Sequence, residues 1–269
     1  MNLDAWKPAE IAARVQAGGV AKVRGNALTL LVLAVLAGAF ISLGGIFYLV
    51  IVTDSQLGLG ITRFLGGLGF SLGLILVVVA GAELFTGNNL VAMAWASRLV
   101  SLPELLKNWV LVYVGNVIGA LGTAVLVWLG GVDQLGAGAV GAKALSIAEA
   151  KASLGFVQAF ALGILCNALV CLAVWLANGG RSIIDKVAAI VLPIAAFVAI
   201  GAEHSIANWF FLPYAYLLGA SESAGFVEGS LQNLGVVTLG NIAGGTLLVA
   251  GVYWLAYLRE GSDLGPAEE

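Results

Sequence analysis

Six long apolar runs dominate the chain and restrict what it can fold into. A helix needs about 20 consecutive apolar residues to cross the hydrocarbon core of a bilayer, and each run reaches that length. Hydrophobic residues make up 61% of the whole chain and charged residues only 10%, which is unlike a soluble domain. The sequence therefore predicts an all-α integral membrane protein. Its six transmembrane spans are expected at 27–52, 64–95, 109–130, 155–178, 187–219 and 232–258.

Two of these runs are too long for a simple crossing. Residues 64–95 and 187–219 would extend ~48 Å and ~50 Å as continuous helices, against a hydrocarbon core of ~30 Å. Near its centre each run has a glycine followed by polar residues, within Gly81-Ala82-Glu83-Leu84-Phe85-Thr86-Gly87-Asn88 and Gly201-Ala202-Glu203-His204-Ser205-Ile206-Ala207-Asn208. We predict that the second and fifth helices are broken there, each into two half-helices joined by a short loop.

The two interrupted runs belong to an internal repeat. Both loops start Gly-Ala-Glu and end in Asn, 120 residues apart, and Gly115-Asn116 in the third run matches Gly240-Asn241 in the sixth. Each half, about 27–130 and 155–258, holds three spans, and an odd number inserts the second half upside down. The sequence thus predicts one transmembrane domain over residues 1–260, an inverted repeat whose broken helices meet near the middle of the membrane, where a pore or a binding site would form.

The polar segments suggest how the chain lies across the membrane. Residues 8–24 suit a helix on the membrane surface, although a solvated leader within the N-terminal segment 1–26 is the alternative. Residues 139–151 suit a second short surface helix, and the acidic tail 261–269 should be solvated. Nine Lys and Arg fall on the side of the termini and three on the other, which predicts that both termini are cytoplasmic.

The broken helices favour an anion near the middle of the membrane. The N-terminal ends of the half-helices carry partial positive charge there, but a bare anion in apolar surroundings costs several kcal/mol. A proton removes most of that cost, and His204, the only histidine, can donate one near neutral pH. The Thr86 hydroxyl could bond to the imidazole or to the ligand. The alternative is a buried neutral histidine with one backbone partner.

Other polar and aromatic residues in these runs have two interpretations. Glu83 and Glu203 could cap free N–H groups of the half-helices or contact a ligand. Asn116 and Asn241 favour hydrogen bonds between helices over ligand contacts. Asn167 and Asn208 could either bond to other helices or contact a ligand. Phe70 and Phe197 could be constrictions on either side of a site or could simply pack against their neighbours.

With these residues assembled, the chain resembles the formate/nitrite transporter family from about residue 8 to 260. The resemblance rests on Ala37–Ser42, Gly81–Gly87, Asn108–Asn116, Gly163–Leu176, Gly180–Ser182, Gly201–Asn208 and Thr238–Gly245. It implies an aquaporin-like fold assembled into a homopentamer, with one pore per subunit for small monovalent anions in the bacterial cytoplasmic (inner) membrane. The segments Gly163–Leu176, Gly180–Lys186 and Glu203–Asn208 look most like formate channels, while nitrite and hydrosulfide channels share the His and the Thr.

The resemblance also implies roles for particular residues. It places Thr86 and His204 at the pore centre, with Asn167 facing the pore. Lys22 and Lys151 would attract anions near the two mouths. The implied constrictions are Phe70 and Phe197 on one side, and Leu74, Leu84, Phe85 and Val170 on the other. Glu203 and Asn208 complete the residues expected at the pore centre.

Other classes of function fit the sequence less well. An aquaporin-like channel for neutral solutes should carry Asn-Pro-Ala loops, which are absent. An intramembrane enzyme is disfavoured because one histidine cannot build a catalytic zinc site, and no cofactor or metal is expected. A scaffold would leave the intramembrane Glu and His unexplained. Net charge of -3 argues against nucleic-acid binding, and Cys166 and Cys171 suit buried thiols.

Overall fold

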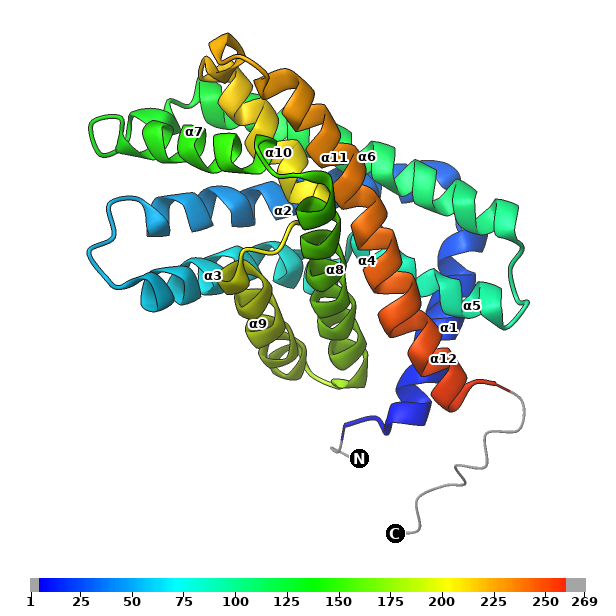
Figure 1. Ribbon diagram of the computed structural model, residues 1–269. Helices are drawn as coiled ribbons and strands as arrows, with labels where there is room; N and C mark the ends of the chain where they lie inside the picture. The colour runs from blue at the N-terminus through cyan, green and yellow to red at the C-terminus, as the bar shows by residue number, and fades with distance from the viewer. Residues whose placement is uncertain (1–4, 260–269) are drawn as a thin grey trace.

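The computed structural model describes residues 5–259, and these residues form a bundle of helices (Figure 1). Six helices in this part of the chain are long and apolar enough to cross a membrane, which confirms the predicted number of spans. The acidic tail 261–269 lies outside the described residues. The six helical segments are Ala27–Val52, Leu59–Gly81, Leu102–Leu129, Phe156–Gly179, Ile183–Ile200 and Phe226–Tyr257.

Local capping explains where the first and third spans begin. Helix α2 (Ala27–Val52) starts after Asn26, whose side chain accepts hydrogen bonds from the N–H groups of Leu28 and Thr29. Helix α6 (Leu102–Leu129) starts earlier than the predicted residue 109, because Ser101 and Glu104 form a capping box ahead of the apolar run. A polar first turn thus extends this span beyond what hydrophobicity alone indicates.

Glycines set the packing of α2 against α6. A side chain at Gly119 of α6 would overlap the carbonyl oxygen of Val35, and one at Gly38 of α2 would overlap that of Asn116. The two backbones therefore approach as closely as small residues permit, which is how membrane helices associate without a hydrophobic driving force between them.

The first broken helix follows the prediction. Helix α3 (Leu59–Ile75) continues as the π-helical segment η1 (Leu76–Gly81), and Gly81 ends it with φ +86°. The chain then restarts as α4 (Phe85–Asn88), η2 (Asn89–Val91) and α5 (Ala92–Ala96). Because α4 begins at Phe85, the connecting loop is shorter than the predicted 81–88.

The second broken helix has the same design. Helix α9 (Ile183–Ile200) ends at Gly201, which has φ +75°, and α10 (Ser205–Leu217) begins after His204. Glycine adopts this left-handed backbone without the steric penalty that other residues incur. Both predicted breaks are therefore confirmed.

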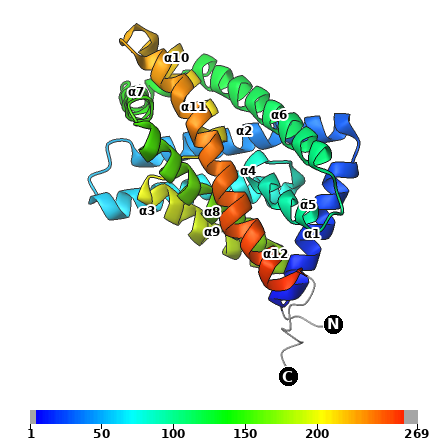
Figure 2. The same cartoon turned by 45° about the vertical axis from the view of Figure 1, so that its right-hand side comes forward.

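The remaining helices enclose the broken pair. They are α1 (Pro8–Arg24), α7 (Ala139–Ala152), α8 (Phe156–Gly179), α11 (Phe226–Ala243), η5 (Gly244–Gly251) and α12 (Val252–Tyr257), with short turns η3 (Val132–Gln134) and η4 (Ala220–Glu222). Helices α1 and α12 lie together at one end of the molecule and α7 lies at the other (Figures 1 and 2). We call these ends the α1 side and the α7 side.

Candidate functional site

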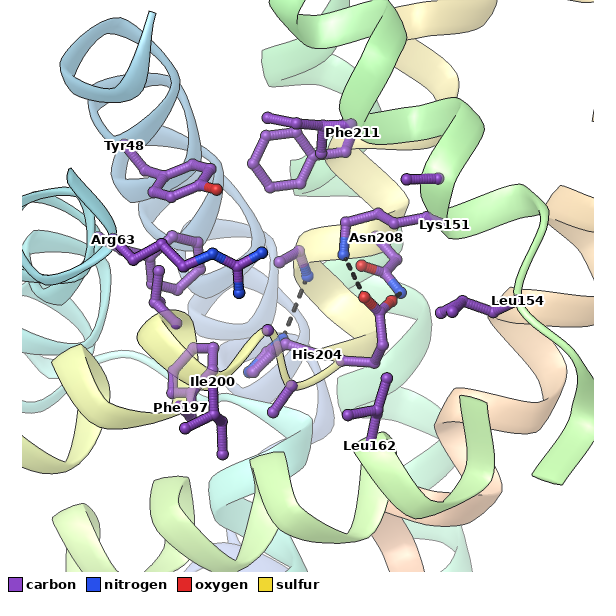
Figure 3. A pocket seen from close by; sticks show the side chains of 18 of the residues that line it. Tyr48, Arg63, Lys151, Leu154, Leu162, Phe197, Ile200, His204, Asn208 and Phe211 are labelled. Atoms are coloured by element: carbon purple, nitrogen blue, oxygen red, sulfur yellow. Dashed lines mark hydrogen bonds and ion pairs between the residues drawn. The ribbon is translucent and has the colours of Figure 1, made fainter. Parts of the chain in front are cut away.

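A cavity of about 400 Å³ opens on the α7 side, and its lining comes from α2, α3, α7, α8, α9 and α10. Figure 3 shows its lining, in which charged and aromatic side chains face one another. Its lining includes Tyr48, Arg63, Phe70, Lys151, Phe197, Glu203, His204, Asn208 and Phe211. The cavity thus reaches from the end of α7 down to the loop that separates α9 from α10.

His204 lies at the inner end of this cavity and caps helix α10. Its Nδ1 accepts a hydrogen bond of 3.1 Å from the N–H of Ala207, so Nδ1 carries no proton. Its Nε2 lies 3.1 Å from Oγ1 of Thr86. A neutral ring must then carry its proton on Nε2 and donate it to the threonine hydroxyl. The sequence prediction that Thr86 can bond to the imidazole is met by this geometry.

A second, smaller cavity of about 80 Å³ lies on the α1 side. Lys22 and Gly87 both line it, and Gly87 follows Thr86 directly in the chain. His204 lines the large cavity, so the hydrogen bond between Thr86 and His204 lies between the two cavities. Both side chains are almost completely buried, with exposed fractions of 0% and 3%.

Aromatic rings close the large cavity next to His204. The rings of Phe70 and Phe197 are 5.5 Å apart and meet edge to face, and the ring of Phe197 lies 6.1 Å from that of His204. Both phenylalanines line the large cavity. They therefore lie on the same side of the Thr86–His204 pair, as the family resemblance implies, and not on either side of the site.

The four apolar residues expected to form the second constriction are buried away from both cavities. They belong to one buried cluster, none lines either cavity, and their exposed fractions lie between 1% and 3%. These residues are Leu74, Leu84, Phe85 and Val170. Phe85 is held by the ring of Tyr113 at 4.9 Å and that of Trp109 at 6.4 Å.

An ion pair flanks the site in each half of the repeat. Lys22 Nζ lies 3.0 Å from Glu83 Oε2, and Lys151 Nζ lies 2.8 Å from Glu203 Oε1. The second pair is more buried: its side chains are 14% and 6% exposed, against 36% and 13% for the first. Each lysine comes from a short helix, α1 or α7, and each glutamate comes from the loop of a broken helix.

Asparagines complete both ion-pair networks. Asn88 donates to Glu83 at 2.8 Å and to Asn108 at 3.1 Å. In the other half, Asn208 donates at 2.7 Å to Glu203, and at the same distance to Asn233. Lys, Glu and two Asn thus recur as a unit in each half, although only the Glu and the first Asn stand in the two matching loop motifs. No site role was predicted from the sequence for Asn108 and Asn233. The signal that could have identified them is their spacing, which equals that of Asn116 and Asn241.

Asn116 and Asn241 hold the two loops in place, which confirms the predicted hydrogen bonds between helices. Asn116 donates to the carbonyls of Ala34 and Glu83 and accepts from the N–H of Phe85. Asn241 likewise donates to the carbonyls of Gly163 and Glu203 and accepts from the N–H of Ser205.

The structure corrects one of the two roles weighed for the glutamates. The first N–H groups of α4 and α10 bond to Asn116 and Asn241, while the carboxylates of Glu83 and Glu203 bond to lysine and asparagine side chains. The capping role is therefore wrong, because buried asparagines already satisfy those donors. Glu203 faces the large cavity.

Asn167 lies apart from both cavities. Both of its amide N–H groups are used, since Nδ2 donates at 2.7 Å to Oδ1 of Asn89 and at 2.7 Å to the carbonyl of Asn241. It links α8 to η2 and α11. Arg63, which does line the large cavity, had no role predicted from the sequence.

Among the described residues there is no group of three His, Cys, Asp or Glu side chains placed to hold a metal ion. Cys166 and Cys171 are free and buried, as predicted. The side chains at this site can therefore supply positive charge, hydrogen bonds and one imidazole to a small ligand.

Comparison with known proteins points to one family. Residues 9–255 match the family model described as formate/nitrite transporter. The chain is 42% identical to the formate channel FocA of Escherichia coli K12, with 96% of each chain covered. It is 38% identical to a probable formate transporter of Methanothermobacter thermautotrophicus, covering 94% of this chain and 97% of that one.

Solved structures agree with the sequence matches. A pentameric formate channel with formate bound is 41% identical, with a TM-score of 0.80 over 87% of this chain and 98% of that chain. A second structure, described as an ion channel of the same family, is 29% identical and has a TM-score of 0.83 over 92% of this chain.

Proposed function

Because this chain belongs to the formate/nitrite transporter family, we propose that it forms a pore for small monovalent anions, with formate as its main substrate. The observation that carries the proposal is the hydrogen bond between Thr86 and His204, which links the two broken helices at the inner end of the large cavity. The relatives of this chain are named as channels and transporters, which points away from enzyme activity.

The pore works by removing charge from the anion where the walls are apolar. A bare carboxylate loses its hydration between Phe197 and Leu84, and that loss costs several kcal/mol. An anion beside the ring favours imidazolium, because opposite charges attract. The second proton of the imidazolium comes from hydronium in the large cavity, which is left as water, and goes to Nδ1 of His204, which then releases the N–H of Ala207. One proton passes to a carboxylate oxygen, and the ring returns to its neutral form.

The surrounding residues have supporting roles in this proposal. Lys151 and Lys22 attract anions to the two mouths. Glu203, bound to Lys151 and Asn208, limits how tightly that lysine can hold an anion. Phe70 and Phe197 form the constriction on the α7 side, and the apolar block of Leu74, Leu84, Phe85 and Val170 forms the one on the α1 side. Asn167 acts by positioning η2 and α11 beside the pore.

The proposed assembly follows the pentameric structure of a family member, and the proposed orientation follows the distribution of Lys and Arg. We propose a homopentamer with one pore per subunit, in the bacterial inner membrane. The six spans make the chain a multi-pass membrane protein, and the excess of Lys and Arg on the α1 side supports the proposal that both termini are cytoplasmic. The α7-side cavity then faces away from the cytoplasm.

The test is formate flux into proteoliposomes between about pH 5 and 8, for the wild type and for His204→Ala. We expect wild-type flux to rise as the pH falls, because imidazolium becomes more abundant, and the variant to lose most of that rise. An unchanged pH profile in the variant would remove His204 as the proton donor.

Substrate choice is tested by comparing the flux of formate, nitrite, hydrosulfide, acetate and lactate at one pH. Faster flux of nitrite or hydrosulfide than of formate would replace formate as the main substrate. Water and glycerol swelling assays should show no permeation.

A further inference from the structure

One cation in the large cavity is not part of the repeated Lys-Glu-Asn-Asn unit. Arg63, in α3, extends its guanidinium into the cavity toward Lys151 (Figure 3). Its Nη1 donates a hydrogen bond of 3.0 Å to the carbonyl of Ala199, at the end of α9. That bond fixes one of the five N–H donors of the guanidinium and leaves the others for a further partner.

Arg63 supplies the positive charge of this mouth that no carboxylate neutralises. Glu203 is paired with Lys151 at 2.8 Å. Both ion pairs found among the described residues involve lysines, and Arg63 belongs to neither. The charged side chains of the cavity are Arg63, Lys151 and Glu203, so with His204 neutral the cavity carries one net positive charge.

The repeat supplies no equivalent on the α1 side. The interval of 120 residues that relates Gly81 to Gly201 relates Arg63 to Ile183, an apolar residue that is 65% exposed. Arg14, the arginine that lines the small cavity, lies over the ring of Trp6 at 4.6 Å. The duplication thus preserved the lysine networks of both mouths, whereas Arg63 is particular to one.

We propose that Arg63 is the residue that receives the anion at the α7-side mouth and that it favours anions with two oxygens in one plane. A guanidinium offers parallel N–H donors that match a carboxylate, whereas an ammonium is a point charge. The anion exchanges its water for this fork before it passes Phe197 and reaches His204. This assignment rests on the proposed function, because it concerns the entry of the same substrate.

The experiment measures flux against anion concentration in proteoliposomes of one protein orientation, with formate added on either side. Arg63→Gln should raise the half-saturating formate concentration on the α7 side by roughly three- to tenfold, with little change for entry from the α1 side. The difference should shrink at high ionic strength. Arg63→Lys should restore much of the affinity but lose part of the preference for formate over chloride.

Lys143→Gln is the matched control, because Lys143 is a cation of helix α7 on the same side of the molecule but does not line the cavity. It should behave as the wild type. An Arg63→Gln curve that overlaps the control overturns the proposal. So does an equal loss of maximal flux from both sides that Arg63→Lys fails to restore, since that result assigns Arg63 only the structural bond to Ala199.

Formate and nitrite flux through the wild-type protein distinguishes a failure of this proposal from a failure of the proposed function. If wild-type protein passes nitrite but not formate, the formate assignment fails, and the same variants are compared with nitrite, which also has two oxygens in one plane. A half-saturating nitrite concentration that Arg63→Gln leaves unchanged then overturns the role of Arg63.

Discussion

Oγ1 of Thr86 lies 3.1 Å from Nε2 of His204, so a buried hydrogen bond joins the restarted half of one broken helix to the loop that precedes the restarted half of the other. The two residues are 118 positions apart in the chain. Each stands in the first turn of a half-helix or just before it, and both are almost completely buried. The position and tautomer of the imidazole therefore depend on a residue from the opposite half of the repeat.

Replacing Thr86 by valine should keep the volume but remove the hydroxyl. Nε2–H of His204 then loses its partner in a buried site, which costs about 1–3 kcal/mol. We expect formate flux to fall about tenfold, with a changed pH profile. Thr123→Val is the control, because the Thr123 hydroxyl donates only to the Gly119 carbonyl of its own helix. Equal flux in both variants would contradict a role for the bond.

Neutralising the two glutamates should have unequal effects on stability. Glu203→Gln leaves Lys151 charged and buried without a carboxylate, a change that costs about 3–5 kcal/mol in comparable pairs. Glu83→Gln should cost less, because Lys22 is more exposed to solvent. Thermal unfolding of the detergent-solubilised protein should give a larger fall in Tm for Glu203→Gln. The reverse order would show that burial does not set the strength of these pairs.

Asn116→Ala and Asn241→Ala should each release one loop. Either change removes three hydrogen bonds and leaves the N–H of Phe85 or of Ser205 without its acceptor. At about 1 kcal/mol for each bond, we expect a loss of roughly 3 kcal/mol in stability. Asn178→Ala is the comparison, since Asn178 bonds only to Val174 of its own helix. Hydrogen exchange at the two loops would report the release directly.

Gly119→Ala should prevent α2 and α6 from packing. Its new methyl group would overlap the carbonyl oxygen of Val35, and backbone cannot move aside as a side chain can. Gly122→Ala, one turn further along α6, meets nothing within 4 Å and should be neutral or slightly stabilising. The yield of folded, assembled protein measures the difference. Similar yields would rule out the close approach of these helices.

Periodic and repeated features were accessible from the sequence because they depend on the chain itself. Hydrophobic length predicted six spans, and the matched Gly-Ala-Glu loops predicted both breaks. The start of α6 was misplaced because a polar capping box extends the helix beyond its apolar run. The sequence predicted only that Asn116 and Asn241 form hydrogen bonds between helices. It did not indicate that each of them holds one of the two loops in place.

The sequence by itself determined the membrane class of this protein, the inverted repeat and the residues that interrupt it, because an apolar run and a duplicated motif are local properties. Tertiary structure decided between the two arrangements considered for Phe70 and Phe197, and it alone showed that Glu83 and Glu203 pair with lysines. It also brought Arg63 into the large cavity. Such contacts depend on how helices far apart in the chain cross, and their crossing is set by packing that no single segment encodes.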